Sequence, residues 1–147
     1  MSARHHADPT LIALVAAGGA VGSIARYGVS HALPPHDGIP VGTFVENVVG
    51  AFLLGMLLEA LVRAGTEDRR RRALRLALGT GVLGGFTTYS ALALEIHGLW
   101  SDGRVGAACA YGLTTVVVGT AAATGGILLG ARRATAVPEP DEQGPDR

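Results

Sequence analysis

The feature that most constrains this chain is a series of long apolar runs that takes up most of its length. A membrane-spanning helix needs about 20 consecutive, mainly apolar residues to cross a hydrocarbon core of about 30 Å. Backbone polar groups inside a bilayer must be satisfied within the spanning segment, so single runs of this length form helices. The sequence therefore predicts an all-α membrane protein with four transmembrane helices, at Thr10–Leu33, Pro40–Val62, Ala73–Leu99 and Val105–Ala131.

The composition agrees with a membrane protein and excludes several other classes. Of the 147 residues, 48% are hydrophobic and only 16% are charged, against roughly 25% charged residues in soluble domains. The 12 basic residues are all Arg and are balanced by 12 acidic residues, so we expect no nucleic-acid partner. A single cysteine, Cys109, excludes a disulfide framework or a Cys-based zinc site within one chain, and we interpret it as a packing residue.

The four runs leave little sequence for a soluble domain. We expect residues 1–9 to form a cytoplasmic tail, residues 10–133 the transmembrane domain, and residues 134–147 a disordered tail rich in Pro and acidic residues. The first run lacks the basic start and short apolar core of a cleaved signal peptide, so we interpret it as a retained span. The segment from Arg63 to Arg72 is expected to be a charged loop.

Arginine residues are distributed unequally between the two sides of the predicted bundle. With four spans, both termini and the central loop lie on the same side, which by the positive-inside rule is the cytoplasmic side of the plasma membrane. The run Arg69–Arg72 is interpreted as a topology signal, with binding of anionic lipid headgroups as the alternative. Two Arg residues, Arg26 and Arg104, fall on the outer side against nine on the inner side, which are Arg4, Arg63, Arg69, Arg70, Arg71, Arg72, Arg75, Arg132 and Arg133.

Glycine is concentrated within the apolar runs and recurs there at helical spacing. This spacing lets the backbones of two helices approach closely. Four spans form a thin bundle with little interior, so a path for a solute forms most easily between subunits, and we expect an oligomer. The glycine pairs are Gly18 with Gly22, Gly81 with Gly85, and Gly126 with Gly130.

Polar side chains within the spans are functional candidates, because placing them in a bilayer is unfavourable. Glu59 lies near the end of a span and can reach water, whereas Asn47 is equally compatible with an interhelical hydrogen bond and with the lining of a pathway. No zinc-protease motif or Ser-His-Asp arrangement can be assembled, and a G-x-G-x-x-G match in the third run lacks the preceding strand of a dinucleotide site. No enzyme activity is predicted. The polar candidates are Arg26, Glu46, Asn47, Glu59 and Glu95.

The third run contains the segment Gly84–Ser90, whose sequence is GGFTTYS. Paired glycines and β-branched threonines weaken a helix, so we expect a break near the middle of this span. Unwound backbone at bilayer depth is tolerated only where it is buried in protein or faces a hydrated cavity, and broken helices are a recurrent way to build ion sites. The alternative is a kinked helix whose Thr hydroxyls bond back to preceding carbonyls.

Three ordered motifs resemble those of the Fluc family of bacterial fluoride channels, also called CrcB, and the resemblance extends over all four spans. The sequence GGAVGSIARY from Gly18 is similar to the family's first-span pattern. GTFVENVVGAFLLG from Gly42 is similar to its second-span pattern, and GGFTTYS from Gly84 to its helix break.

The resemblance implies an antiparallel dimer of four-helix subunits that conducts fluoride passively out of the cytoplasm. It also implies a structural sodium ion that is not transported, held on the dimer axis by the backbone carbonyls of Gly84 and Thr87. Carbonyl oxygens suit a hard cation, and hydroxyl and amide donors suit a small, strongly hydrated anion. The pore is implied to be lined by Asn47, Thr88, Tyr89, Ser90, Leu92 and Tyr111, with Glu95 matching an acidic residue beyond the aromatic positions 89 and 92.

The chain departs from the family pattern at three positions. Leu92 replaces an aromatic residue, Tyr89 adds a hydroxyl where Phe is usual, and Glu46 stands where Val is usual. Self-pairing members need a weak charge bias to insert in both orientations, whereas nine Arg against two fixes one orientation here. We therefore hypothesise a heterodimer with a homologous subunit of opposite Arg bias. In it, one of the two pores has lost part of its usual lining on this chain.

Two alternative functions differ from a conducting subunit. A small multidrug exporter is also a dimer of four-span chains, but it needs a carboxylate in the first span, which this chain lacks. Glu46 in the second span keeps a proton-coupled transporter conceivable. The second alternative is a non-conducting partner subunit of a heterodimeric channel, which follows if loss of the aromatic at Leu92 closes the pore.

Overall fold

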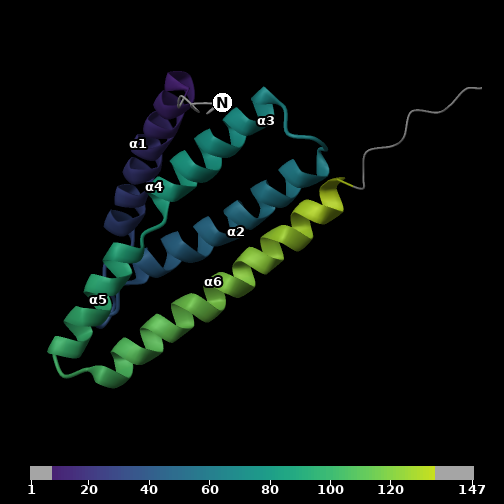
Figure 1. Cartoon of the computed structure of the whole chain (residues 1–147). Helices are drawn as coiled ribbons and strands as arrows, with labels where there is room; N and C mark the ends of the chain where they lie inside the picture. Colours follow the sequence, from purple (N-terminus) through teal and green to yellow (C-terminus); the bar gives the residue numbers. More distant parts are fainter. Residues whose placement is uncertain (1–7, 135–147) are drawn as a thin grey trace, which may run out of the picture.

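The chain folds into long helices with short connections (Figure 1). The computed structural model describes residues 8–134, so Arg4 and most of both predicted tails lie outside the described residues. The predicted all-α architecture with four spans is confirmed, because four helical segments are long and apolar enough to cross a membrane. They are Pro9–Ala32, Val41–Arg63, Arg69–Ser101 and Val105–Arg132.

The first two spans begin as local sequence rules require. Helix α1 covers Pro9–Ala32, and the carboxylate of Asp8 caps its start by accepting a hydrogen bond from the Thr10 amide at 3.0 Å. Proline is favourable at the first helical position, because an N–H group there would have no intrahelical acceptor and its loss costs no hydrogen bond. Helix α2 covers Val41–Arg63.

The third span is built from several helical pieces. Helix α3, Arg69–Leu74, continues into the π-helix η1, Arg75–Leu83, and the short helix α4, Gly84–Phe86. Helix α5, Tyr89–Ser101, follows after two residues. The π-helix has a wider coil, in which the Gly84 amide donates to the carbonyl of Gly79.

The predicted charged loop Arg63–Arg72 is wrong at both ends, because Arg63 is the last residue of α2 and Arg69–Arg72 is helical. The side chain of Asp68 accepts a hydrogen bond from the Arg71 amide at 2.7 Å and so caps α3. Arginine is a good helix former. The connecting loop is therefore shorter than expected.

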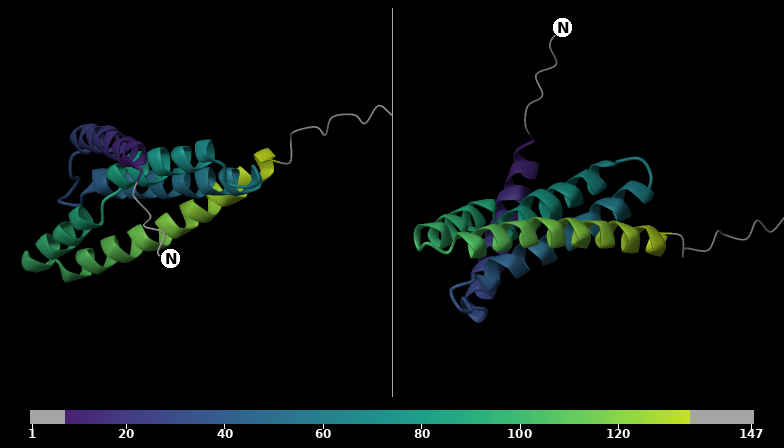
Figure 2. Two further views of the ribbon diagram at one scale, coloured as in Figure 1. Left: turned by 45° about the horizontal axis from the view of Figure 1, so that its top comes forward. Right: turned by 90° about the horizontal axis from the view of Figure 1, so that it is seen from below.

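The helices associate in two closely packed pairs (Figure 1, Figure 2). Helix α6, Val105–Ala134, lies along α2, and α1 lies along η1 and α4. Within each pair the chains run in the same direction, because one intervening span separates them. The start of α1, the α2–α3 connection and the end of α6 share one end of the bundle (Figure 1).

Glycine allows this close packing. A Cβ atom added to Gly22 would overlap the carbonyl oxygen of Val82, and one added to Gly126 would overlap the carbonyl oxygen of Phe52. The same holds, less severely in places, for the other members of the three predicted glycine pairs, each of which meets the backbone of another helix. The predicted role of these pairs in close helix approach is confirmed.

Buried side chains are few, and the outer surface is apolar. One buried cluster joins α5 and α6 through Leu92, Leu99, Ala108 and Tyr111. Large apolar side chains such as Ile24 are widely exposed instead, as expected for a surface that faces lipid. The bundle therefore has little interior among the described residues, as predicted for four spans.

Candidate functional site

The polar centre of the fold is the junction between α4 and α5. Thr87 and Thr88 have extended backbone, with ψ 154° at Thr87 and φ −148°, ψ 120° at Thr88. The hydroxyl of Thr88 accepts a hydrogen bond from the Ala91 amide at 3.1 Å and so caps α5. Glycines before the junction and a capping threonine within it explain why the helical backbone is interrupted at this point.

Asn47 of α2 binds both backbone polar groups of Thr88. Its Nδ2 donates to the Thr88 carbonyl at 2.9 Å, and its Oδ1 accepts from the Thr88 amide at 2.8 Å. Backbone groups at bilayer depth need such partners once they leave a helix. Asn47 therefore replaces the helical hydrogen bonds that Thr88 lacks, and its second Nδ2 hydrogen stays available for another acceptor.

Carbonyls at the same junction lose their helical donors, those of Gly84 and Thr87 among them. In a continuous helix the Thr88 amide would donate to the Gly84 carbonyl, and the Ala91 amide to the Thr87 carbonyl. The Thr88 amide donates to Asn47 instead, and the Ala91 amide donates to the Thr88 hydroxyl. The carbonyl oxygens of Gly84 and Thr87 are consequently released from the helical ladder.

Arg26 of α1 reaches the same junction. Its Nε donates to the Gly85 carbonyl at 3.2 Å. A cation near the C-terminal end of a helical segment interacts favourably with the carbonyls that end it. The predicted in-membrane Arg26 therefore has a partner at the end of α4.

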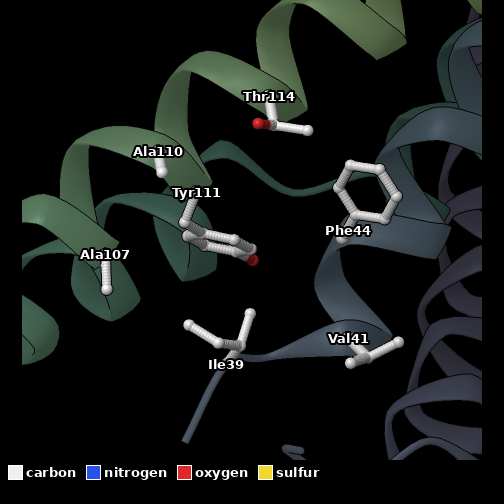
Figure 3. A pocket seen from close by; sticks show the side chains of 7 residues that line it. All are labelled: Ile39, Val41, Phe44, Ala107, Ala110, Tyr111 and Thr114. Atoms are coloured by element: carbon white, nitrogen blue, oxygen red, sulfur yellow. The ribbon is translucent and has the colours of Figure 1, made fainter.

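A second polar cluster surrounds Glu95 of α5. Its Oε1 accepts from the Thr43 hydroxyl at 2.6 Å and its Oε2 from the Tyr111 hydroxyl at 2.8 Å, which also lies 3.2 Å from the Pro40 carbonyl. Figure 3 shows the Tyr111 ring pointing from α6 toward the start of α2, beside Phe44 and above Ile39. Three helices thus meet at one carboxylate.

Glu46 of α2 is fully buried, and its hydrogen bond joins it to α1 rather than to the residues of these two clusters. Its Oε1 accepts a hydrogen bond from the Ser30 hydroxyl at 2.6 Å, which joins α2 to α1. Among the described residues, its Oε2 has no hydrogen-bond partner. A buried polar atom without a partner is unfavourable and is uncommon in folded proteins.

A groove collects several of the predicted pore-lining residues. Asn47, Thr88, Tyr89 and Leu92 line it together. The Tyr89 side chain is exposed, whereas Leu92 is only 7% exposed because it packs against Tyr111. The opposite wall comes from α6 and consists of Thr115, Val116, Gly119, Thr120 and Ala123.

The remaining predicted residues do not line this groove. The Ser90 hydroxyl is 3.3 Å from the Thr88 hydroxyl. Tyr111 lines a separate pocket at the start of α2 (Figure 3) and contacts the groove residues Leu92 and Thr115. Glu46 and Arg26 line neither cavity. Glu46 bonds to Ser30 between α1 and α2, and Arg26 bonds to Gly85 between α1 and α4.

The sequence interpretation predicted Thr87 and Thr88 but missed two other threonines of the site, Thr43 and Thr115. Thr43 holds Glu95, and Thr115 lines the groove while its hydroxyl donates to the Tyr111 carbonyl at 2.7 Å. Thr43 was identifiable because it lies four residues before Asn47 and so shares its helix face. The signal in α6 was the recurrence of threonine at 114, 115, 120 and 124 in a mainly apolar span.

Comparison with known proteins identifies the family. The family described as "CrcB-like protein, Camphor Resistance (CrcB)" matches residues 13–127. The protein named "Fluoride-specific ion channel FluC 2" from Leifsonia xyli is 52% identical over 118 residues, which cover 80% of this chain and 81% of that protein. "Fluoride-specific ion channel FluC 1" from Cutibacterium acnes is 49% identical over 112 residues, which cover 76% and 78%. The Agrobacterium fabrum protein "Fluoride-specific ion channel FluC" is 43% identical over 121 residues, which cover 81% and 94%. With this coverage, the chain belongs to the CrcB family.

Proposed function

We propose that this chain is a subunit of a fluoride channel, which lets fluoride leave the cytoplasm passively across the plasma membrane. The observation that carries the proposal is its 52% identity, over four-fifths of both chains, to a protein named as a fluoride-specific ion channel. Four apolar helices of spanning length agree with a channel subunit.

The donors around the α4–α5 junction suit fluoride. An anion that leaves water needs hydrogen-bond donors in place of its hydration shell. The hydroxyls of Thr88 and Ser90 and the second Nδ2 hydrogen of Asn47 are such donors, and the ring edge of exposed Tyr89 is electropositive. We propose that fluoride passes along these four residues. Leu92 contributes an apolar wall and Tyr111 a hydroxyl farther along the path.

We further propose a structural sodium ion at the carbonyls of Gly84 and Thr87. Both oxygens have lost their helical donors, because the amides of Thr88 and Ala91 bond elsewhere. Unwound carbonyls are established ligands for sodium in membrane proteins. No group of three or more His, Cys, Asp or Glu side chains able to hold a metal occurs within residues 8–134, so carbonyls are the donors on which this proposal rests.

Two carbonyls cannot complete the coordination of a sodium ion, so the site needs a second subunit. We propose an antiparallel dimer, with the groove beside the junction facing the partner. The excess of Arg at the cytoplasmic ends of the spans holds both termini of this chain in the cytoplasm. A partner of opposite orientation is then a homologous subunit with the inverse Arg bias, and the assembly is a heterodimer.

A specific observation also favours a non-conducting role for this chain within such a heterodimer. Leu92 occupies an aromatic position of the implied pore, and although it lines the groove it is only 7% exposed, because it packs against Tyr111. An aliphatic side chain has no electropositive ring edge to offer fluoride. In that case the pore formed by the partner conducts, and this chain supplies half of the sodium site.

Fluoride efflux from liposomes tests the proposal. We would load vesicles with potassium fluoride, add a potassium ionophore and follow release with a fluoride electrode, for this chain alone and with a homologous partner. Release with chloride retained supports the channel. Absence of release in both preparations would refute it.

Variants at the junction separate the conducting from the non-conducting role. Thr88→Ala and Tyr89→Ala should abolish the share of efflux that passes along this chain. Unchanged efflux in both variants, with release that depends on the partner, would favour the non-conducting role. In vesicles prepared with added sodium, replacing that sodium by an organic cation should slow efflux if the ion at Gly84 and Thr87 is structural.

A further inference from the structure

Helices α1 and α3 diverge toward the end of the bundle that carries the arginine run (Figure 1, Figure 2). Helix α1 packs against η1 and α4, which lie deeper in the span. Between the first turns of α1 and the α3–η1 segment the structure has a groove. Its walls are aliphatic and its mouth is charged, with Leu11, Ile12, Val15, Ala16 and Leu76 forming the walls and Asp8 and Arg72 lying at the mouth.

Among the residues of the described range the guanidinium of Arg72 has no partner, whereas those of Arg69, Arg71 and Arg75 each have one. Arg69 pairs with Asp8 at 3.3 Å and Arg75 with Glu67 at 2.8 Å. The Thr10 amide, with Arg69, holds the pKa of the Asp8 carboxyl below its usual value, so Asp8 is ionised and already engaged. An unsatisfied cation therefore stands at the head of an apolar groove.

This pairing of groups matches one class of ligand. A phospholipid has a phosphate that a guanidinium binds through two parallel hydrogen bonds, and acyl chains that an aliphatic groove accepts. The excess of Arg at this end of the bundle places it in the cytoplasmic leaflet, which contains anionic lipids. The groove opens where such a lipid would lie, with its headgroup at the membrane surface.

The arginine run contains a built-in comparison. Arg70 and Arg72 are two residues apart, both are exposed, and both lack an ion pair within residues 8–134. As topology signals they are equivalent, because the positive-inside rule counts charge rather than direction. Only Arg72 lines the groove.

We infer that this groove binds one anionic phospholipid, whose phosphate contacts Arg72 and whose acyl chain lies along Leu11, Val15 and Leu76. The inference does not depend on what the channel conducts. It depends on the groove and on the unpaired guanidinium at its mouth.

The test uses the purified full chain in a neutral detergent. Phosphatidylglycerol is titrated into it, and the unfolding temperature and the number of lipids retained in native mass spectrometry are measured. We expect saturable stabilisation with one retained lipid, and no effect from phosphatidylcholine or inorganic phosphate. Arg72→Gln should weaken the apparent affinity by about tenfold, the loss of one charge-assisted contact, whereas Arg70→Gln should leave it within about twofold.

A second variant tests the apolar part of the site. Ala16→Phe narrows the groove without changing charge, and it should also reduce lipid retention. Equal loss in Arg70→Gln and Arg72→Gln would overturn the inference, because it would mean diffuse attraction to a charged surface. Equal stabilisation by phosphatidylcholine would overturn it as well. A groove covered by a second copy of the chain would instead make the unfolding temperature depend on protein concentration and not on lipid.

Discussion

The close packing of α1 against the third span predicts opposite effects for two Gly→Ala substitutions in α1. At Gly22 an added methyl group would overlap the Val82 carbonyl oxygen and lie 2.9 Å from the Phe86 amide nitrogen. Both neighbours are backbone atoms, so no flexible side chain can move aside. At Gly28, six residues further along the same helix, an added Cβ meets nothing within 4 Å.

The magnitudes follow from these surroundings. Relief of the overlap at Gly22 requires the two backbones to separate by about 1 Å, and overpacking of this kind destabilises by about 1–3 kcal/mol. Replacement of Gly by Ala in a helix contributes about 0.5–1 kcal/mol in the opposite direction. Gly22→Ala should therefore be less stable than the unsubstituted chain, and Gly28→Ala equally or slightly more stable. Their stabilities should differ by about 1–3 kcal/mol, the size of the overpacking term that only Gly22→Ala carries.

The assay is thermal unfolding of the purified chain in detergent, followed by tryptophan fluorescence from Trp100, with fluoride efflux measured on the same preparations. Gly22→Ala should also reduce efflux, because it displaces α4 just before the junction at Thr87 and Thr88. Indistinguishable unfolding temperatures for Gly22→Ala and Gly28→Ala would show that the backbones of α1 and η1 are not in contact. That result would refute the packing argument.

Three further substitutions test the polar contacts. Asn47→Ala leaves both backbone groups of Thr88 without partners and should destabilise by about 1–3 kcal/mol, lowering the unfolding temperature and abolishing efflux; full retention of both would contradict the proposed clamp. Tyr111→Phe keeps the ring but removes the hydrogen bond to Glu95 Oε2. We expect the free energy of unfolding to fall by about 0.5–1.5 kcal/mol in the same unfolding assay, and no change would mean that a second donor reaches Oε2. Glu46→Gln retains an acceptor and removes a buried carboxylate, so its unfolding temperature should be equal or higher; a marked decrease would show that the carboxylate has a partner in the assembled channel.

The spans and the site were predictable to different degrees. Long apolar runs identify the four spans because the thickness of a bilayer sets a length that a single run must meet. The GGFTTYS segment marks the α4–α5 junction because glycine and threonine weaken a helix locally. The arginine run misled the loop prediction, since its charges suggested a loop, whereas the Asp68 cap starts a helix within it.

The sequence by itself determined properties that depend on neighbouring residues and on the solvent: four helices of spanning length, their Arg bias, and glycines placed for close contact. Only the tertiary structure decided which groups meet. Asn47 and Thr88 are 41 residues apart, Thr43 and Glu95 are 52 apart, and Arg26 and Gly85 are 59 apart. The physical reason is that hydropathy is a property of each segment, whereas a hydrogen bond between helices depends on which faces pack and at what height. Glycine spacing permits such packing, but it does not specify the partner.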